Sequence, residues 1–239
     1  MKYSREQRAE LRKKEDMTTP AVADAEDGGR SVFFWREYEE PYGSLCQWYT
    51  SCFRDPDVHP THVFNCAEQY MMYRKALVLA TLDEDADVSA LTKSAVPGKK
   101  GARSQPGSRR DAVGKAQSDP SRLPDMILAE QRPSRQKGLA RSVRFSPAQL
   151  KEWEAVKFDV VVQGSYCKYS QNVDLRERLL ATGDRELIEA SPQDTVWGIG
   201  FAAEFAERHR ADWGSNLLGK ALMNVRERLK EELAKLADD

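Results

Sequence analysis

The sequence predicts an α+β fold that is predominantly α-helical, with a few short strands in a single compact domain. Several segments repeat apolar residues at the spacing of one helix face, and the longest of them lies at the C-terminal end of the chain. The β-branched and aromatic run at 32–35 favours a short strand near the N-terminus. A chain of 239 residues with 40% hydrophobic content is long enough to bury one substantial core.

Two polar segments set the boundaries of this domain. Residues 1–30 mix charged and small side chains without apolar periodicity, so we expect a disordered N-terminal tail. Residues from about 84 to 122 are rich in Gly, Ser, Pro, Lys and Arg, and we expect a disordered basic insertion. The ordered domain then spans residues 31–239 around that insertion. The insertion is either a solvated linker or a flexible segment that attracts the phosphates of a nucleotide or nucleic acid.

The first ordered elements are short, and a helix follows them. Val32–Trp35 is predicted to be a strand, and a small hairpin is predicted around Asp57–Phe64 because two prolines and an Asp bound a turn there. A helix is predicted from about Cys66 to Leu82. Asn65, followed three residues later by Glu68, matches a capping box, in which both polar side chains bond the backbone at the helix start.

Three further helices are predicted after the insertion. Two short ones fall on the stretch PDMILAEQ and on Ser134–Val143. Ser146, with Pro147 and Gln149 after it, is a good start signal for a third. That helix is expected to carry apolar side chains on one side, namely Leu150, Trp153, Val156 and Val160.

The last two predicted helices lie in the C-terminal third. One covers Asp174–Thr182 and ends at Gly183, because glycine favours the left-handed conformation that closes many helices. The other begins near Asn216 and shows the clearest helical periodicity in the chain. Its apolar stripe is expected to pack on the core and comprises Leu217, Leu218, Ala221, Leu222, Val225, Leu229, Leu233 and Leu236.

Net charge and hydropathy narrow the classes of function. The formal net charge of −1 argues against a protein that coats nucleic acid or membranes with its whole surface, although a local basic patch remains compatible with it. No apolar run approaches the length that spans a bilayer, and the N-terminus has no apolar core of a secretory signal. We therefore expect an intracellular protein, cytoplasmic or nuclear, with no membrane partner. The sequence leaves the oligomeric state open.

The cysteine pattern argues against a disulfide framework or a structural metal site. The four cysteines lack C-x-x-C spacing, and reduced thiols are expected inside the cell; they are Cys46, Cys52, Cys66 and Cys167. His59 and His62, three residues apart beside Cys66, suggest a metal site or a turn. Pro60 between the two histidines favours the turn.

The main candidate site lies on the helix after Asn65. Glu68 and Lys75 are seven residues apart, which is two helical turns, so both side chains leave from nearly the same face. An acid and an amine presented together suit catalysis, although an ordinary helix with one charged stripe has the same pattern. Candidate substrate-binding side chains close in sequence are Trp48, Tyr49, Phe53 and Met72.

Two polar segments downstream are further candidates. In SPQDTVWGIG, Pro192 and two glycines prevent a long regular element, so the segment is a place for a functional or turn-capping side chain. The KYSQN block is expected to enter a helix whose exposed N–H groups could meet a phosphate, or to supply a cap through Asn172 or Asp174. Its candidate ligands are Lys168, Ser170, Gln171 and Asn172. No dinucleotide-binding or P-loop glycine fingerprint is present.

Three sequence blocks carry a resemblance to a known family. They are YGSLCQWYTSCF with FNCAEQYMMYRKAL, then GSYCKYSQNVDLRERLLATGDRELIEASPQDTVWGIG, then WGSNLLGKALMNVRERL. In residue type, spacing and order they resemble the NADAR family, the YbiA-like proteins, over roughly residues 31–82 and 126–236. The departures are Cys52, where the family usually has Pro, and Ser165, where it often has Asn. The resemblance implies a YbiA-like domain.

The resemblance also implies a reaction class, the hydrolysis of an N-glycosidic bond without a metal or organic cofactor. The main hypothesis is removal of ADP-ribose from modified guanine, as a free nucleotide or within nucleic acid, through a lysine Schiff base. One alternative is an N-glycosidase acting on ribosylaminopyrimidine phosphates of riboflavin synthesis. Another is a module that binds ADP-ribose or a related nucleotide without cleaving it.

The resemblance assigns roles to particular residues. Lys75 is the expected nucleophile, and Glu68 and Asp194 share the roles of general acid and ribose-orienting group without a fixed assignment. Trp197 and Gly198 belong to the same pocket. A lysine must be neutral to attack, and a nearby carboxylate opposes loss of its proton unless Glu68 is itself protonated.

Overall fold

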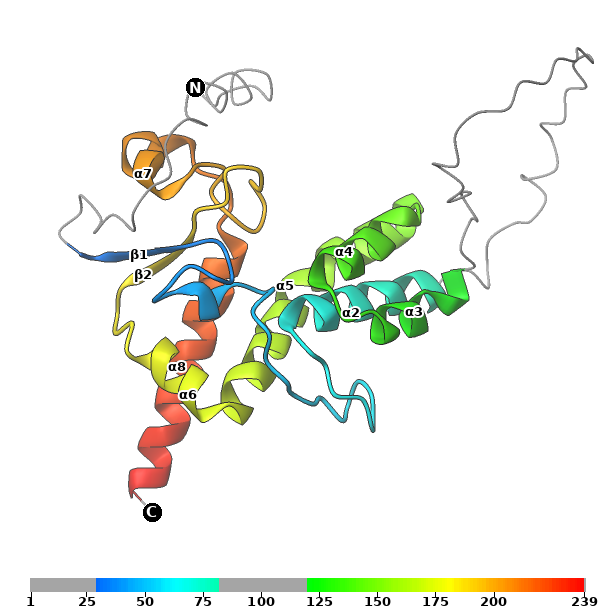
Figure 1. Ribbon diagram of the computed structural model, residues 1–239, viewed down its shortest axis with the longest axis horizontal. Helices are drawn as coiled ribbons and strands as arrows, with labels where there is room; N and C mark the ends of the chain where they lie inside the picture. Colours follow the sequence, from blue (N-terminus) through cyan, green and yellow to red (C-terminus); the bar gives the residue numbers. More distant parts are fainter. Residues whose placement is uncertain (1–28, 82–119, 239) are drawn as a thin grey trace, which may run out of the picture.

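The computed structural model describes residues 29–81 and 120–238, and Figure 1 shows their arrangement. Almost all of the predicted N-terminal tail and insertion lies outside these residues. At the two margins the described residues include a few that belong to these predicted segments. The carbonyl of Arg30 accepts a hydrogen bond of 2.9 Å from the N–H of Glu186, and Pro120–Arg122 forms a short 3-10 helix, η4.

A two-stranded parallel sheet joins the start of the described chain to a segment in its C-terminal third. The predicted N-terminal strand is β1, Ser31–Phe34, and it pairs in parallel with β2, Glu186–Glu189, so that Val32 lies opposite Leu187. The sequence did not predict β2, because a four-residue strand between polar segments has too few positions to show a period. The sheet lies against helix α8, as Figure 1 shows.

The segment between β1 and the first long helix is mostly irregular. It contains the 3-10 helix η1, Gly43–Leu45, and a loop closed by an antiparallel bridge between Phe53 and Phe64, whose N–H groups donate to each other's carbonyls at 3.2 and 2.9 Å. This bridge confirms a hairpin-like turn near the predicted one, although the paired residue on its first arm lies before Asp57.

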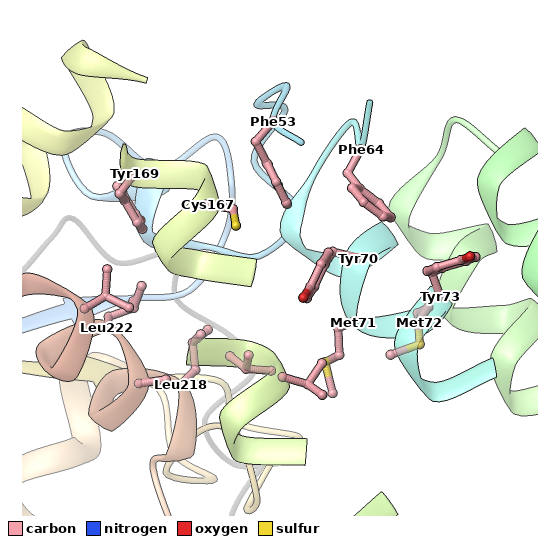
Figure 2. Close-up of a cluster of buried hydrophobic side chains, with 14 of the residues drawn as sticks. Phe53, Phe64, Tyr70, Met71, Met72, Tyr73, Cys167, Tyr169, Leu218 and Leu222 are labelled. Carbon is pink, nitrogen blue, oxygen red and sulfur yellow. The ribbon is translucent and has the colours of Figure 1, made fainter. Parts of the chain in front are cut away.

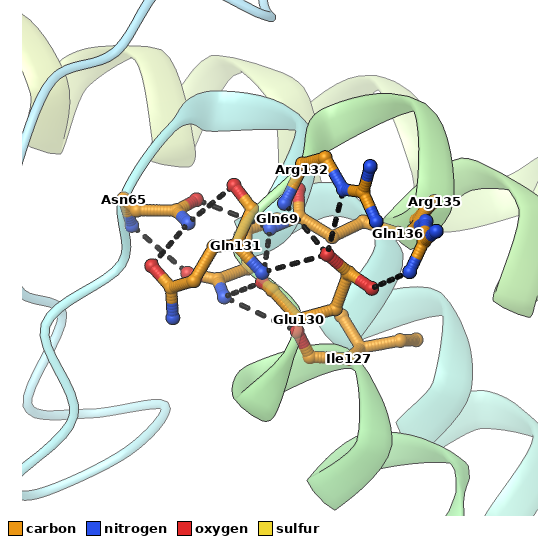
Figure 3. Close-up of polar contacts among 8 residues, drawn as sticks. All are labelled: Asn65, Gln69, Ile127, Glu130, Gln131, Arg132, Arg135 and Gln136. Carbon is orange, nitrogen blue, oxygen red and sulfur yellow. Dashed lines mark hydrogen bonds and ion pairs between the residues drawn. The ribbon is translucent and has the colours of Figure 1, made fainter.

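Three helices form one side of the molecule: α2, Ala67–Thr81; α3, Leu123–Ala129; and α4, Pro133–Ser142. The predicted capping box of Asn65 and Glu68 is wrong. The N–H of Glu68 donates to the carbonyl of Gln47, and Gln69 reaches back to accept a 2.9 Å hydrogen bond from the N–H of Asn65. The side chain of Asn65 bonds the α3–α4 connection instead (Figure 3).

The central helix α5, Pro147–Gln171, crosses α2 at close range and also packs on α8. Its predicted capping box is confirmed, because Ser146 accepts from the N–H of Gln149 while the Gln149 side chain accepts from that of Ser146. A Cβ at Gly164 would lie 2.5 Å from the Tyr70 ring, so only glycine allows this crossing. Leu150, predicted to share one side of this helix with Trp153 and Val160, is 49% exposed, whereas Trp153 and Val160 are buried.

Helix α6, Val173–Leu180, follows directly after Asn172, and the chain then passes Gly183 at a φ of 62°, as predicted for a helix-closing glycine. After β2 come the short helices α7, Ala203–Ala206, and η5, Glu207–Asp212, and then α8, Leu217–Asp238. The predicted stripe on α8 is buried from Leu218 to Leu229. Leu233 and Leu236 are exposed, because the end of α8 extends past the core (Figure 1).

The main core lies where α2, α5 and α8 meet, and Figure 2 shows its centre. Phe53, Phe64 and Tyr70 stack there, and each buried aromatic ring contributes about 1.5–3 kcal/mol to the free energy of unfolding. A smaller core between the sheet and α7 contains Phe33 and Ile188. In the part of the chain that the structure describes, no helix combines the length and the apolarity needed to cross a bilayer.

Candidate active site

Lys75 lies in the third turn of α2, with its amine against two aromatic rings. Its Nζ is 4.7 Å from the ring centre of Phe145 and 5.7 Å from that of Trp153. Burial lowers the pKa of Lys75, and the positive charge of Arg141 on α4 lowers it further, against an opposing contribution from Glu68. The balance is downward, so the surroundings favour the neutral amine.

Glu68 lies in the first turn of the same helix and is only 4% exposed. Its Oε2 accepts a 3.2 Å hydrogen bond from Nε1 of Trp48, while its Oε1 is buried without a hydrogen-bond partner. Burial raises the pKa of Glu68, and the positive charge of Lys137 on α4 is the largest effect opposing that rise. A carboxyl in this position is biased toward its protonated form.

Glu189, at the end of β2, is a third acidic group of the site and was not predicted from the sequence. The residue is half-buried, but its Oε2 is fully buried and has no hydrogen-bond partner. Burial, and then the nearby charge of Asp194, raise the pKa of Glu189 to about 8. One sequence feature could have pointed to Glu189: it comes two residues after Leu187. In a strand the two side chains leave from the same face, so the carboxylate shares a face with an apolar residue.

Asn216 holds Glu189 in place from the start of α8. It has a φ of 48°, which is uncommon for a residue other than glycine and is tolerated best by Asn and Asp. Its Oδ1 accepts a 3.0 Å hydrogen bond from the N–H of Glu189, and its Nδ2 donates to the carbonyl of Leu187 at 2.9 Å. The side chain thus pairs with β2 as a further strand would.

Gln47 brings another unpaired atom to the same place. The residue is 8% exposed, and its Oε1 is buried without a hydrogen-bond partner. The carbonyl of Gln47 accepts a 3.1 Å hydrogen bond from the N–H of Glu68, which joins the 46–48 segment to the start of α2. Sequence reasoning passed over Gln47, because one glutamine beside aromatic residues carries no pattern.

Asp194 and Trp197 lie on the tight turn after β2. Oδ1 of Asp194 accepts hydrogen bonds from the N–H groups of Val196 and Trp197 at 2.9 and 2.8 Å, so this carboxylate caps the turn. Its charge contributes to the raised pKa of both Glu68 and Glu189, which places it beside the two. A Cβ at Gly198 would lie 2.7 Å from the carbonyl of Glu189, so the turn needs glycine there.

The KYSQN block lies at the C-terminal end of α5, so its predicted place at the start of a helix is wrong. Lys168 is fully buried, and its Nζ donates to the carbonyls of Ser44 and Cys46 at 2.7 and 3.2 Å. The Nδ2 of Asn172 donates to the carbonyl of Lys168 at 2.7 Å, and α6 has no side-chain cap from Asn172 or Asp174.

The other members of this block also make contacts within the chain. The Ser170 hydroxyl donates to the carbonyl of Cys167 at 3.5 Å. The Gln171 side chain accepts from the N–H of Arg54 and donates to its carbonyl, at 2.8 and 2.7 Å. The block therefore fastens the loop around residues 52–54 and the 44–46 segment to α5.

The four candidate side chains near Lys75 in the sequence divide into two groups. Phe53 and Met72 are 2% and 5% exposed and lie in the main core, pointing among other apolar side chains (Figure 2). Trp48 is half-buried, with its indole N–H on Glu68 and its ring 5.9 Å from Nζ of Lys137. Tyr49 is also half-buried and faces Nζ of Lys168 at 5.5 Å. Of these four side chains, Trp48 is the one that bonds an acidic side chain of the site, Glu68.

The structure bears on two earlier expectations, the metal site or turn at His59 and His62 and the state of the four cysteines. Among residues 29–81 and 120–238, no three His, Cys, Asp or Glu side chains are grouped as ligands of one ion. Nδ1 of His59 accepts a 3.0 Å hydrogen bond from the N–H of His62, as expected of a turn. All four cysteines are free thiols, and burial raises the pKa of Cys46 and Cys66 to about 12.

The site therefore combines an amine and a carboxyl whose pKa values are shifted in opposite directions. The pKa of Lys75 is lowered, and that of Glu68 is raised. Two basic residues of α4, Lys137 and Arg141, lie close enough to shift both pKa values. Two groups on one helix whose pKa values are shifted in opposite directions are suited to act as a nucleophile and an acid.

Known proteins resemble this chain in sequence and in fold. "N-glycosidase R617" of Acanthamoeba polyphaga mimivirus is 49% identical over 94 residues, which are 38% of this chain and 54% of that protein. "Protein irg-1" of Caenorhabditis elegans is 33% identical over 168 residues, 70% of this chain and 61% of that protein. The chain thus matches little more than half the length of these relatives.

The NMR structure of the Escherichia coli protein YbiA has the same fold, with a TM-score of 0.54. It is 20% identical in sequence, and the superposition covers 85% of this chain and 86% of that one. This likeness confirms the predicted compact α+β, YbiA-like architecture. The model of the NADAR domain matches residues 33–113 and 112–230, which together make up most of the sequence. The chain therefore belongs to the NADAR family.

Proposed function

We propose that the protein is an N-glycosidase, a hydrolase that cleaves the bond between a ribosyl group and a nitrogen atom. The observation that carries the proposal is the pairing of Lys75 and Glu68 on one helix with opposite pKa shifts. The name of its mimivirus relative, an N-glycosidase, supports the same reaction class. The preferred substrate is guanine that carries ADP-ribose.

Lys75 is the nucleophile in this mechanism. Its neutral amine attacks the anomeric carbon, the carbon–nitrogen bond to the base breaks, and the leaving nitrogen takes the bonding electron pair. Glu68 donates a proton to that nitrogen, which makes the base a better leaving group. The raised pKa of Glu68 weakens the objection that an ionised Glu68 would hold the proton on Lys75.

The covalent intermediate is then resolved by water. The lysine nitrogen, having lost its proton, pushes its electron pair toward the anomeric carbon as the sugar ring opens, and the ring oxygen takes up a proton. The product is a Schiff base between Lys75 and the open-chain sugar. Water adds to its carbon, the lysine leaves, and the free sugar aldehyde closes again, so that the net reaction is hydrolysis.

Asp194 acts as a positioning residue in this scheme. Its Oδ1 accepts hydrogen bonds from the N–H groups of Val196 and Trp197, so it fixes the loop beside Glu68 and Glu189. This leaves the ring of Trp197, which is half-buried at the edge of the main core, as the aromatic surface of that loop for the substrate.

The mechanism is tested by trapping the Schiff base. The protein is incubated with guanine-ADP-ribosylated DNA and, separately, with a ribosylaminopyrimidine phosphate, each with and without borohydride. We expect release of ADP-ribose and, with borohydride, a reduced adduct on Lys75 detected by mass spectrometry. Lys220→Met, which changes an exposed lysine of α8, is the control and retains both signals. Binding of ADP-ribose without cleavage of either substrate would instead indicate a binding module.

The pH dependence provides a second test. Activity is expected to rise with pH as Lys75 loses its proton, at a pKa below that of an ordinary lysine. It is expected to fall again as Glu68 loses its proton, at a pKa above that of an ordinary glutamate. A profile without the alkaline fall would contradict the role of Glu68 as the acid.

A further inference from the structure

Unpaired buried oxygen atoms are concentrated in one place. Within residues 29–81 and 120–238, four buried side-chain polar atoms have no hydrogen-bond partner, and three are oxygens of Gln47, Glu68 and Glu189. These residues come from the 46–48 segment, the start of α2 and the end of β2. A buried acceptor without a donor costs about 1–3 kcal/mol, so three together are unusual in a folded protein.

The three residues are neighbours in space. The main chain of Gln47 is bonded to that of Glu68, and the indole of Trp48 is bonded to the Glu68 carboxyl. The charge of Glu68 contributes to the raised pKa of Glu189. Glu189 in turn contributes to the raised pKa of Cys46, which precedes Gln47 in the chain. Gln47 is therefore adjacent to Glu68 through the main chain, and the Glu189 carboxyl lies near enough to Glu68 for their charges to interact.

We propose that Gln47 and Glu189 form a subsite that binds the adjacent hydroxyl groups of the substrate's ribose. This inference rests on the proposed function, because it places the ribose next to the group that protonates the leaving base. Neither residue is required for the chemical step itself. Their role is to hold the sugar and to distinguish ribose from deoxyribose.

The chemistry of the subsite favours a sugar over a phosphate. Phosphate oxygens are negatively charged acceptors, and they cannot donate to the unpaired amide oxygen of Gln47. Sugar hydroxyls both donate and accept, so each can pair with an amide oxygen or a carboxyl oxygen. The 2-hydroxyl of a ribose is also bonded to the carbon next to the anomeric centre. A side chain near Glu68 is therefore well placed to reach it.

The test compares binding of ribose 5-phosphate with that of 2-deoxyribose 5-phosphate, measured by calorimetry. The wild-type protein is expected to bind the ribose form about 10-fold or more tightly, as one or two hydrogen bonds to a buried group imply. In Gln47→Leu and in Glu189→Leu the ratio of the two affinities should fall toward one. The matched control is Glu186→Leu on the same strand, because Glu186 pairs with Arg210 at the protein surface, and it should keep the wild-type ratio.

Unfolding in urea separates this role from a structural one. Replacing an unpaired buried carboxyl by leucine should leave the stability of Glu189→Leu equal to or greater than that of the wild-type protein. A loss of stability together with an unchanged affinity ratio would assign Glu189 to the fold and overturn the proposal. A wild-type ratio near one would overturn it as well.

The outcomes for the subsite and for the proposed function are distinguishable. If the protein cleaves N-glycosides but neither leucine variant changes the affinity ratio, the subsite is wrong and the N-glycosidase stands. If the ratio depends on Gln47 and Glu189 but no substrate is cleaved and no adduct forms on Lys75, the subsite stands and the chemistry is wrong. Each measurement therefore decides one of the two proposals.

Discussion

Two neighbouring residues at the start of α2 occupy opposite kinds of polar environment. Gln69, 1% exposed, donates from Nε2 to the carbonyls of Ile127, Leu128 and Glu130 at 3.1 Å each, and its Oε1 accepts from the N–H of Asn65. Figure 3 shows this network. Glu68, equally buried, has one partner for two oxygens. Complete pairing at Gln69 serves the fold, whereas incomplete pairing at Glu68 leaves capacity for a substrate.

Two lysines, the buried Lys168 and the half-buried Lys75, show the same contrast. Burial lowers the pKa of Lys168 to about 8, but the Lys168 amine donates to two main-chain carbonyls and is enclosed. The amine of Lys75 lies over aromatic rings, which offer no strong acceptor. A lowered pKa alone therefore does not identify a nucleophile, and the surroundings of the nitrogen decide.

The largest expected effect concerns these two lysines. Lys75→Met should reduce turnover by on the order of 10⁴-fold or more, because it removes the nucleophile while keeping a side chain of similar length. Lys168→Met should instead lower the free energy of unfolding, since two buried carbonyls each lose one of their donors. Single-turnover kinetics and urea unfolding of both variants check the contrast. Equal losses of turnover in two folded proteins would show that the lysines are not distinguished in this way.

The next effect concerns Glu68. Glu68→Gln should reduce turnover by roughly 10²- to 10⁴-fold, the usual contribution of a general acid, because an amide cannot donate the required proton. Its stability should stay close to that of the wild-type protein, since the amide keeps an acceptor for Trp48. Turnover and urea unfolding are measured beside Glu152→Gln, an exposed glutamate of α5. Wild-type turnover in Glu68→Gln would remove it from the mechanism.

Gln69→Leu should affect the fold rather than the chemistry. The change removes a donor from three carbonyls, of which that of Glu130 keeps Gln136, and removes the acceptor of the Asn65 N–H. We therefore expect a loss of about 1–3 kcal/mol or more in the free energy of unfolding. The measurement is urea unfolding, with Gln193→Leu on the exposed turn as the control. Stability equal to the wild-type value would show that the network in Figure 3 contributes little.

A smaller effect is expected at Lys137. Its positive charge lowers the pKa of Glu68, so Lys137→Met should raise that pKa and move the alkaline fall of the activity profile to higher pH. Arg135→Met, which removes a surface partner of Glu130, is the control and should leave the fall in place. A shift to lower pH would mean that Glu68 is not the group whose deprotonation ends activity.

The smallest effect is a pH dependence of stability. The pKa of Glu189 is raised from 4.5 to about 8, so between these values the folded protein holds a proton that the unfolded chain releases. Stability contributed by this group is present below pH 4.5 and is lost as pH rises toward 8. Glu189→Gln removes the titration, so its stability should fall less than that of the wild-type protein between pH 5 and pH 8. Parallel urea curves would contradict the raised pKa.

Elements with a long or strongly signalled pattern were predictable from the sequence. The Ser146 capping box and the apolar stripe of α8 up to Leu229 depend on local chemistry, and the structure has both. Strand β2 was not predictable, because its pairing partner lies near the other end of the chain. Leu233 and Leu236 continue the stripe on α8 beyond the region that has anything to pack against.

The candidate site also has parts that local sequence predicts and parts that depend on distant segments. Glu68 and Lys75 share one helix, so their spacing alone predicted that they face the same way. The part played by Glu189 depends on β2 and on Asn216, and that of Gln47 depends on an irregular segment. The sequence did not show that α5 continues through Tyr169 to Gln171. This continuation places the KYSQN block at the end of α5 and buries Lys168.

The parallel pairing of β1 with β2 has a consequence for synthesis on the ribosome. Strand β1 and the α2 residues Glu68 and Lys75 emerge early, but β2 emerges only after the insertion and α5, and Asn216 later still. Closing this long loop is entropically costly, so the sheet forms after the local helices. A nascent chain therefore carries Glu68 and Lys75 before Glu189 and Asn216 are in place. The candidate site is completed only after the start of α8 has been synthesised.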